Sequence, residues 1–327
     1  MQPISDRIME TSIPDPKFFI ISTRGRSGSM WLSNMLSRHP GIVAFHGANI
    51  PAYYPGEGVR VSPAQYARDL IQLRNLSGGN RVFGCIHSYH YANDVAPVCD
   101  ALGGHFAYIV RHPIKRMFSI FWGEVRANHP NIARSEKQLF EKLAAIATDA
   151  EPVLRQLHPE DFMHLSPVDT YKSIKLFSGL WFRRNILFWR KNPTEIWRRR
   201  LPADTANLVE AFLTAVHSTL FFDMCALGAA GADRAIKFEE MTVSQSYFEN
   251  VVVRKILPSA SDLSAYLETV FQVGPVNSNT SDTQTSDWRD IFSQLPAPFQ
   301  EFFLRMVDEM SVVEQGNPYT AFDYEMP

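Results

Sequence analysis

The amino-acid sequence predicts a three-layer α/β/α domain built on a central parallel sheet of about four to five strands. Short continuous apolar runs, such as 17–22 and 106–110, have the pattern of strands buried on both faces. Stretches with helical periodicity alternate with these runs, as expected when helices cover both faces of a parallel sheet. The composition agrees, because 45% hydrophobic and 20% charged residues in a chain of 327 are ordinary for a globular domain with a substantial core.

The predicted elements follow one another along the chain. The strand at 17–22 leads into a turn of small and basic residues at 23–29, and the helix after it stops at His39-Pro40-Gly41. Further strands are expected at 42–45, 81–86, 106–110 and 235–238, and helices at about 62–75 and 114–127. The stretch from about 134 to 230 and the region after the last strand have a mostly helical pattern.

Nothing in the sequence divides the chain into separate folding units. It shows neither an internal repeat nor a domain linker, so residues 1–327 are predicted to form one domain. Residues 1–16 are polar and predict a loose N-terminal leader. Residues 277–287, NSNTSDTQTSD, are a polar low-complexity tract without an apolar anchor, which predicts a mobile loop.

Charge and cysteine content narrow the class of partner and the compartment. The formal net charge of −2 gives no basic excess, which argues against nucleic acid as the main partner. The N-terminal residues lack the apolar run of a signal peptide, and no stretch approaches the ~18–20 uninterrupted apolar residues of a membrane span. Cys85, Cys99 and Cys225 are scattered and odd in number, which indicates a reducing compartment. We therefore expect a cytoplasmic enzyme without a membrane partner.

The turn between the first strand and the first helix is a candidate phosphate site. A helix N-terminus offers unpaired backbone N–H groups and a partial positive charge, and glycines let the backbone approach an anion closely. A plain strand–helix turn would also use glycine and serine for capping, but it would not need two arginines. The candidate phosphate ligands are Arg24, Gly25, Arg26, Ser27, Gly28 and Ser29.

This turn departs from the nucleotide loop of ATPases and kinases. That loop requires Gly-Lys-Ser/Thr, and here no lysine follows Gly28. Met30 stands where the hydroxyl that holds Mg²⁺ would be. An ordinary ATPase or kinase is therefore disfavoured.

A second basic residue is placed at the end of the strand at 106–110. Arg111 follows that strand directly, where open α/β sheets place their ligands. Ser119 lies eight residues later, just over two helical turns on, so it falls near the same face. The alternative interpretation is a basic helix start, in which Lys115 and Arg116 are solvent-facing or structural.

These two motifs resemble those of the sulfotransferases that use 3′-phosphoadenosine 5′-phosphosulfate (PAPS). TRGRSGSMWL at 23–32 is similar to the family's 5′-phosphosulfate loop, with Arg26 at the basic position. Met30 departs from the usual second hydroxyl, and Trp31 matches the aromatic residue that packs near the adenine. The spacing of Arg111 and Ser119 resembles the family's 3′-phosphate motif.

The resemblance covers about 17–120 and 234–292. Ile236–Met241 resembles the family's late strand with an acidic end, in which we interpret Glu239 as structural. Asp287-Trp288-Arg289 resembles a segment that follows the family's basic C-terminal donor loop, but here the preceding loop carries no basic residue. The resemblance implies a P-loop-NTPase-like sulfotransferase fold, PAPS as donor, and no metal requirement.

A base is needed to activate the acceptor, and histidine suits that role near neutral pH. His87 follows the strand at 81–86 and resembles the family's catalytic histidine, although the lysine of the family's Lys-Thr-His segment is missing. His46 ends the strand before it and is the second candidate. The alternative for each is a purely structural role, as a hydrogen-bonded histidine at the end of a strand. His87 and His90 alone are weak evidence for a metal site.

Residues 181–200 carry seven Arg/Lys against one Glu, with interleaved aromatics. They fit a helix with a solvated basic face, a part of the donor or acceptor pocket, or a nucleic-acid surface.

The hypothesis is sulfuryl transfer to a hydroxyl or amine of a small-molecule acceptor, by in-line displacement with a histidine base. Its rivals are a kinase-like phosphotransferase and a non-catalytic nucleotide- or RNA-binding module that uses 181–200. The sequence leaves the acceptor's identity and the oligomeric state open.

Overall fold

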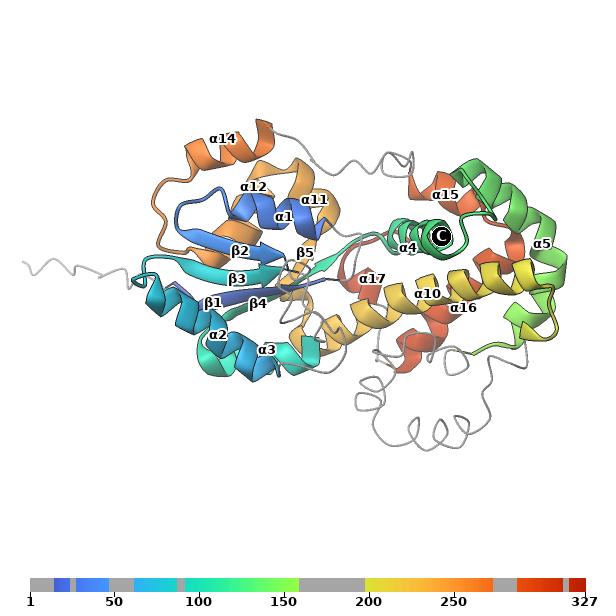
Figure 1. Cartoon of the computed structure of the whole chain (residues 1–327), viewed down its shortest axis with the longest axis horizontal. Coiled ribbons are helices and arrows are strands. Elements are labelled where there is room, and N and C mark those ends of the chain that lie inside the picture. The colour runs from blue at the N-terminus through green and yellow to red at the C-terminus, as the bar shows by residue number, and fades with distance from the viewer. Residues whose placement is uncertain are drawn as a thin grey trace, which may run out of the picture.

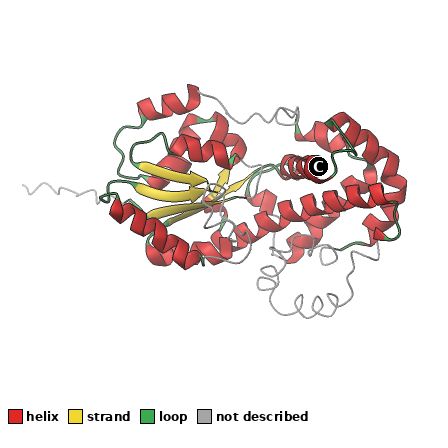
Figure 2. Cartoon of the chain, in the orientation of Figure 1, coloured by secondary structure: helices red, strands yellow, loops and turns green. Residues whose placement is uncertain are grey.

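The structure is a computed structural model that describes residues 15–23, 28–46, 62–86, 92–158, 198–272, 287–313 and 318–327. In these residues a five-stranded sheet has the order β2-β3-β1-β4-β5, and every neighbouring pair is parallel. The strands are β1 (Phe18–Ser22), β2 (Ile42–His46), β3 (Val82–Ile86), β4 (His105–Val110) and β5 (Ala235–Lys237). This sheet, with its helices, confirms the predicted fold class (Figure 2).

Alternate residues of the central strand β1 belong to two separate cores. Phe18 and Ile20 lie in one cluster, and Phe19 and Ile21 in the other, because successive side chains of a strand point to opposite faces. All four are fully buried. The continuous apolar run in the sequence is therefore the signature of a strand covered on both sides.

Helices cover both faces of the sheet (Figure 1). The second core lies beneath α1 and the short helices after β5, and the first core lies beneath α2 and α3. Ser62 caps α2 by accepting from the Gln65 N–H at 3.2 Å. The helices are α1 (Ser29–Leu36), α2 (Pro63–Leu76), α3 (Ala92–Leu102), α11 (Phe238–Val243), α12 (Gln245–Tyr247), the π-helix η5 (Phe248–Val253), α13 (Arg254–Ile256) and α14 (Ser264–Gln272).

A second group of helices extends the first core away from the sheet (Figure 1). They are α4 (Pro113–Asn128), α5 (Glu136–Gln156), α10 (Ala203–Ala230), α15 (Trp288–Gln294), α16 (Ala297–Val313) and α17 (Pro318–Ala321), and the 3-10 turn η4 (Ala232–Arg234) links α10 to β5. By length and composition α10 could cross a membrane, but 82% of its apolar window is buried inside the protein. That burial is what a core helix requires.

The predicted helices and strands that fall on described residues are confirmed, apart from the last residue of the strand predicted at 235–238. Phe238 was expected in the strand but begins α11. Glu239 and Glu240 occupy the first turn of that helix, where carboxylates are stabilised by the helix dipole. Residues 1–14 of the predicted leader and 277–286 of the predicted loop lie outside the described residues, whereas Asp287 caps α15.

Candidate active site

The carboxyl ends of the parallel strands meet at one edge of the sheet. His46 of β2 is in register with Ile86 of β3, and Val110 of β4 is in register with Lys237 of β5. The residues that directly follow the strands therefore gather at this edge, where open α/β sheets bind ligands. The candidate phosphate and base residues come from these strand ends.

Gly28 forms the turn that starts α1. Its φ of 71° and ψ of 17° are left-handed, and it is the N-cap of the helix. A Cβ at this position would lie 2.4 Å from a ring carbon of Phe238, so only glycine fits without movement. The first turn of α1 contains no acidic residue, so no carboxylate within that turn neutralises the positive end of the helix dipole.

His46 contacts the first residue of α1. Its Nε2 lies 3.0 Å from the Ser29 Oγ, and both side chains are buried. Burial lowers the pKa of His46 from its ordinary value, so the imidazole is neutral at pH 7. The hydroxyls of Ser33 and Ser37 each donate to the Ala44 carbonyl at 3.0 Å and hold α1 against β2. A neutral histidine is thus fixed beside the helix N-terminus.

Arg111 leaves β4 at the same edge. Its side chain is buried, and its guanidinium carbon lies 5.1 Å from the centroid of the Phe238 ring. Burial lowers the pKa of Arg111, and the neighbouring Glu239 opposes that shift. Arginine nevertheless stays protonated in proteins. The fold therefore places a charged, planar donor group at the strand edge, the kind of group that binds phosphate bidentately.

Phe238 brings the two predicted motifs together. One edge of its ring lies against Gly28, and its face lies beneath Arg111. No sequence motif pointed to Phe238 as a site residue. Its neighbour Glu239 accepts hydrogen bonds from the His112 N–H at 3.0 Å and from the Tyr324 hydroxyl at 2.9 Å. Glu239 therefore holds chain segments together, which agrees with the structural role predicted for it.

Three other predicted site residues have different environments. Met30 is 47% exposed, on the first turn of α1. Trp31 is 4% exposed and packs edge-on against Phe248 at 5.7 Å between ring centroids, inside the second core. That is the environment of a core aromatic residue, and its predicted contact with an adenine stays a prediction. Ser119 is half-buried on α4.

The remaining predicted site residues lie outside the described residues: Arg24, Gly25, Arg26, Ser27 and His87. Of the basic stretch, only residues 198–200 are described. There Arg198 pairs with Glu210 at 2.9 Å and Arg200 reaches the Gln156 side chain at 3.4 Å. Within the described part of the chain, no group of three or more His, Cys, Asp or Glu side chains could hold a metal ion.

Comparison with known proteins yields one structural similarity. No protein-family profile matches the sequence, and no curated protein matches it. Among solved structures, a sulfotransferase from Alicyclobacillus acidocaldarius is 16% identical and covers 95% of this chain and 100% of its own, with a TM-score of 0.35. At that level of similarity the function has to be argued from the site itself.

Proposed function

We propose that this protein is a sulfotransferase that moves the sulfuryl group of PAPS to a hydroxyl or amine of a small-molecule acceptor. One observation carries the proposal: Gly28 at the start of α1 and the buried Arg111 both lie against Phe238, at the carboxyl edge of the sheet. PAPS has phosphate groups at two separate positions, the 5′ and the 3′. The helix start suits the first and the arginine suits the second.

The residues have distinct roles in the proposed reaction. The acceptor oxygen or nitrogen attacks the sulfur atom while the bond between sulfur and the 5′-phosphate oxygen breaks, and the acceptor's proton passes to a histidine. Sulfated product and 3′-phosphoadenosine 5′-phosphate (PAP) are released. Arg26 and the backbone amides at the start of α1 would stabilise the charge on the sulfuryl oxygens and the departing phosphate. Arg111 and Ser119 would hold the 3′-phosphate, so that positioning contributes as it does in phosphoryl transfer.

Two histidines remain candidates for the base. His87 is favoured by the sequence resemblance, and it follows β3, the neighbour of both β1 and β2 in the sheet. His46 is neutral and 3.0 Å from Ser29, a geometry that suits either proton acceptance or orientation of the serine. A His87→Ala variant that loses turnover while a His46→Gln variant keeps it would assign the base to His87. The reverse pattern would assign it to His46.

The donor site is tested by calorimetric titration with PAP, with ADP and ATP as competitors and a chelator present. We expect binding that prefers PAP and needs no Mg²⁺. Arg111→Ala should weaken it roughly ten- to hundredfold, as expected for the loss of a charged hydrogen-bonding partner. Arg68→Ala, on the exposed face of α2, is the matched control and should bind as the wild type does. Equal affinity for ADP, or no effect of Arg111→Ala, would overturn the proposal.

A further inference from the structure

His112, the residue after Arg111, is enclosed by the C-terminal part of the chain. Its ring stacks on Trp288 with 4.9 Å between centroids and an interplanar angle of 15°, and Tyr324 meets it edge-on at 5.5 Å. Its Nε2 lies 3.0 Å from the backbone carbonyl oxygen of Glu325, to which it donates. The side chain is 6% exposed. The last residues of the chain therefore fix the point where β4 passes into α4.

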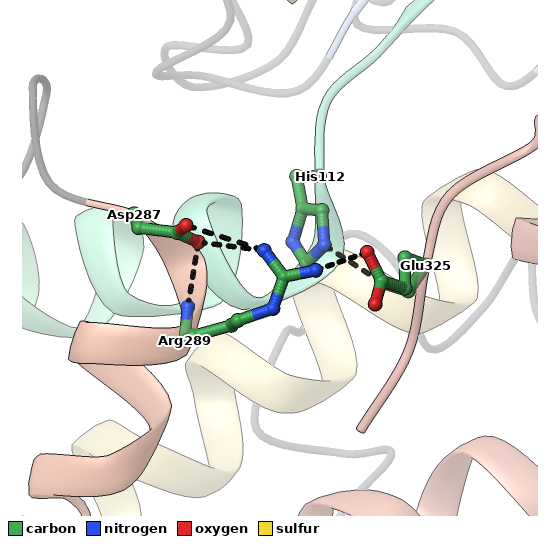
Figure 3. Close-up of polar contacts among 4 residues, drawn as sticks. All are labelled: His112, Asp287, Arg289 and Glu325. Atoms are coloured by element: carbon green, nitrogen blue, oxygen red, sulfur yellow. Dashed lines mark hydrogen bonds and ion pairs between the residues drawn. The ribbon is translucent and has the colours of Figure 1, made fainter.

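The same C-terminal residues reach three other elements. The Glu325 carboxylate pairs with Arg289 of α15, which also pairs with Asp287 at 3.2 Å (Figure 3). Tyr324 donates its hydroxyl to Glu239 of α11 at 2.9 Å. Asp323 lies 3.6 Å from the Lys237 Nζ at the end of β5. We call residues 323–327 the C-terminal strap, because they join the turn between β4 and α4 to β5, α11 and α15.

The part-buried hydrogen bonds of the strap matter more than its exposed ion pairs. The side chains of Arg289 and Glu325 are 52% and 67% exposed, and such pairs contribute little because water screens them. The hydroxyl of Tyr324, by contrast, satisfies a carboxylate that also accepts from the His112 backbone. The carboxylate of Glu239, the residue after Phe238, thus connects the strap to His112, the residue after Arg111.

Movement of the strap would therefore disturb Arg111 from two sides. His112, its neighbour in the backbone, would lose its contacts with the strap. Glu239 would lose the hydrogen bond from Tyr324, and it directly follows Phe238, on whose ring the Arg111 guanidinium lies. We propose that the C-terminal strap positions Arg111 for the 3′-phosphate of the donor, with Tyr324 as its principal positioning residue. This inference rests on the proposed function for the identity of the ligand, but the mechanical link between the strap and the end of β4 does not.

The test compares Tyr324→Phe with a matched variant, Tyr266→Phe. Tyr266 is also half-buried and donates its hydroxyl to a backbone carbonyl, that of Met35, at the far end of α1. Each variant loses one hydroxyl and keeps its ring, and thermal unfolding with circular dichroism checks that both are folded. A chain ending at Phe322 removes the whole strap. Two quantities are measured for each: hydrogen–deuterium exchange of the amides at 109–117, without ligand, and the affinity for PAP by calorimetry.

We expect Tyr324→Phe and the shortened chain to exchange faster at 109–117 and to bind PAP about tenfold or more weakly, whereas Tyr266→Phe changes neither. Unchanged exchange at 109–117 would show that the strap does not hold the end of β4 in place. Faster exchange with undiminished PAP affinity would overturn its role in positioning Arg111. If wild-type protein binds no PAP, the proposed function and the donor role fall together, and the exchange data still decide whether the strap holds the end of β4.

Discussion

Gly28 and Gly78 have similar left-handed backbones, with φ of 71° and 84°, but different surroundings. A Cβ on Gly28 would lie 2.4 Å from the Phe238 ring, whereas a Cβ on Gly78 meets nothing within 4 Å. Alanine substitutions at the two glycines therefore separate two costs: a side chain on a left-handed backbone, and contact with the Phe238 ring. The close approach of Gly28 to that ring is what brings the start of α1 next to the ring beneath Arg111.

Gly28→Ala is expected to weaken PAP binding at least tenfold, because the ring or the turn must move away. It should also lower the free energy of unfolding by about 2–5 kcal/mol, the sum of backbone strain and overpacking. Gly78→Ala should cost only the strain, about 1–2 kcal/mol, and leave PAP binding unchanged. Urea unfolding and calorimetry measure the two quantities. Equal effects of the two substitutions would show that the approach of Phe238 to Gly28 has no functional role.

At the scale of the elements, a buried ion pair joins three helices. Arg116 of α4 pairs with Asp223 of α10, and both side chains are fully buried. Tyr319 of α17 donates to the same aspartate at 3.3 Å, and Arg116 also donates to the Ile109 carbonyl at 2.8 Å. The pair thus ties the helix that follows Arg111 to the helical part of the first core.

Asp223→Asn should lower the free energy of unfolding by about 3–5 kcal/mol, because it leaves a buried guanidinium without its counter-charge. The control is the double variant Arg116→Met, Asp223→Leu, which removes both charges and should regain most of that loss. Urea denaturation curves of the wild type and the two variants give the comparison. A loss below about 0.5 kcal/mol in Asp223→Asn would contradict a role of the pair in stability.

The elements were predictable where the signal was local. Continuous apolar runs identified the strands. The turn before α1 indicated Gly28 as a candidate site residue, and the strand ends indicated His46 and Arg111. Arg116 shows the limit. Its place in the sequence fits either a solvent-facing or a structural arginine, and only the structure shows that it is fully buried, since its partner Asp223 lies 107 residues away. Phe238 was missed for the same reason, because its contacts come from distant segments.

At the scale of the whole molecule, burial at both ends of β4 links folding to pH. His105 begins the strand and His112 follows it, and burial lowers the pKa of each to about 4. His112 donates through Nε2 to Glu325, and its buried Nδ1 has no hydrogen-bond partner among the described residues. Protonation at Nδ1 would add a buried charge without an acceptor, which is why the ring stays neutral.

The sign of the pH effect follows from this shift. The unfolded histidine, with an ordinary pKa of about 6.5, binds its proton at a higher pH than the folded one does. The contribution of the neutral histidine to the free energy of unfolding is therefore complete above pH 6.5 and is lost as the pH falls toward 4. For His112 the loss is on the order of 3 kcal/mol. Asp223 acts in the opposite direction, because burial raises its pKa to about 6, so only a comparison of variants isolates the histidine.

His112→Gln keeps a side-chain donor but cannot titrate, so its free energy of unfolding should fall less than that of the wild type between pH 6.5 and 4. His105→Gln serves as the second comparison, since it removes a histidine with a similarly lowered pKa at the opposite end of the strand, away from the strap. Urea unfolding at half-unit pH steps gives the three curves. If the His112→Gln curve runs parallel to that of the wild type through this window, the enclosure of His112 by the strap does not hold the ring neutral in solution. Convergence of the two curves at low pH would instead tie the acid sensitivity of the fold to the residue next to Arg111.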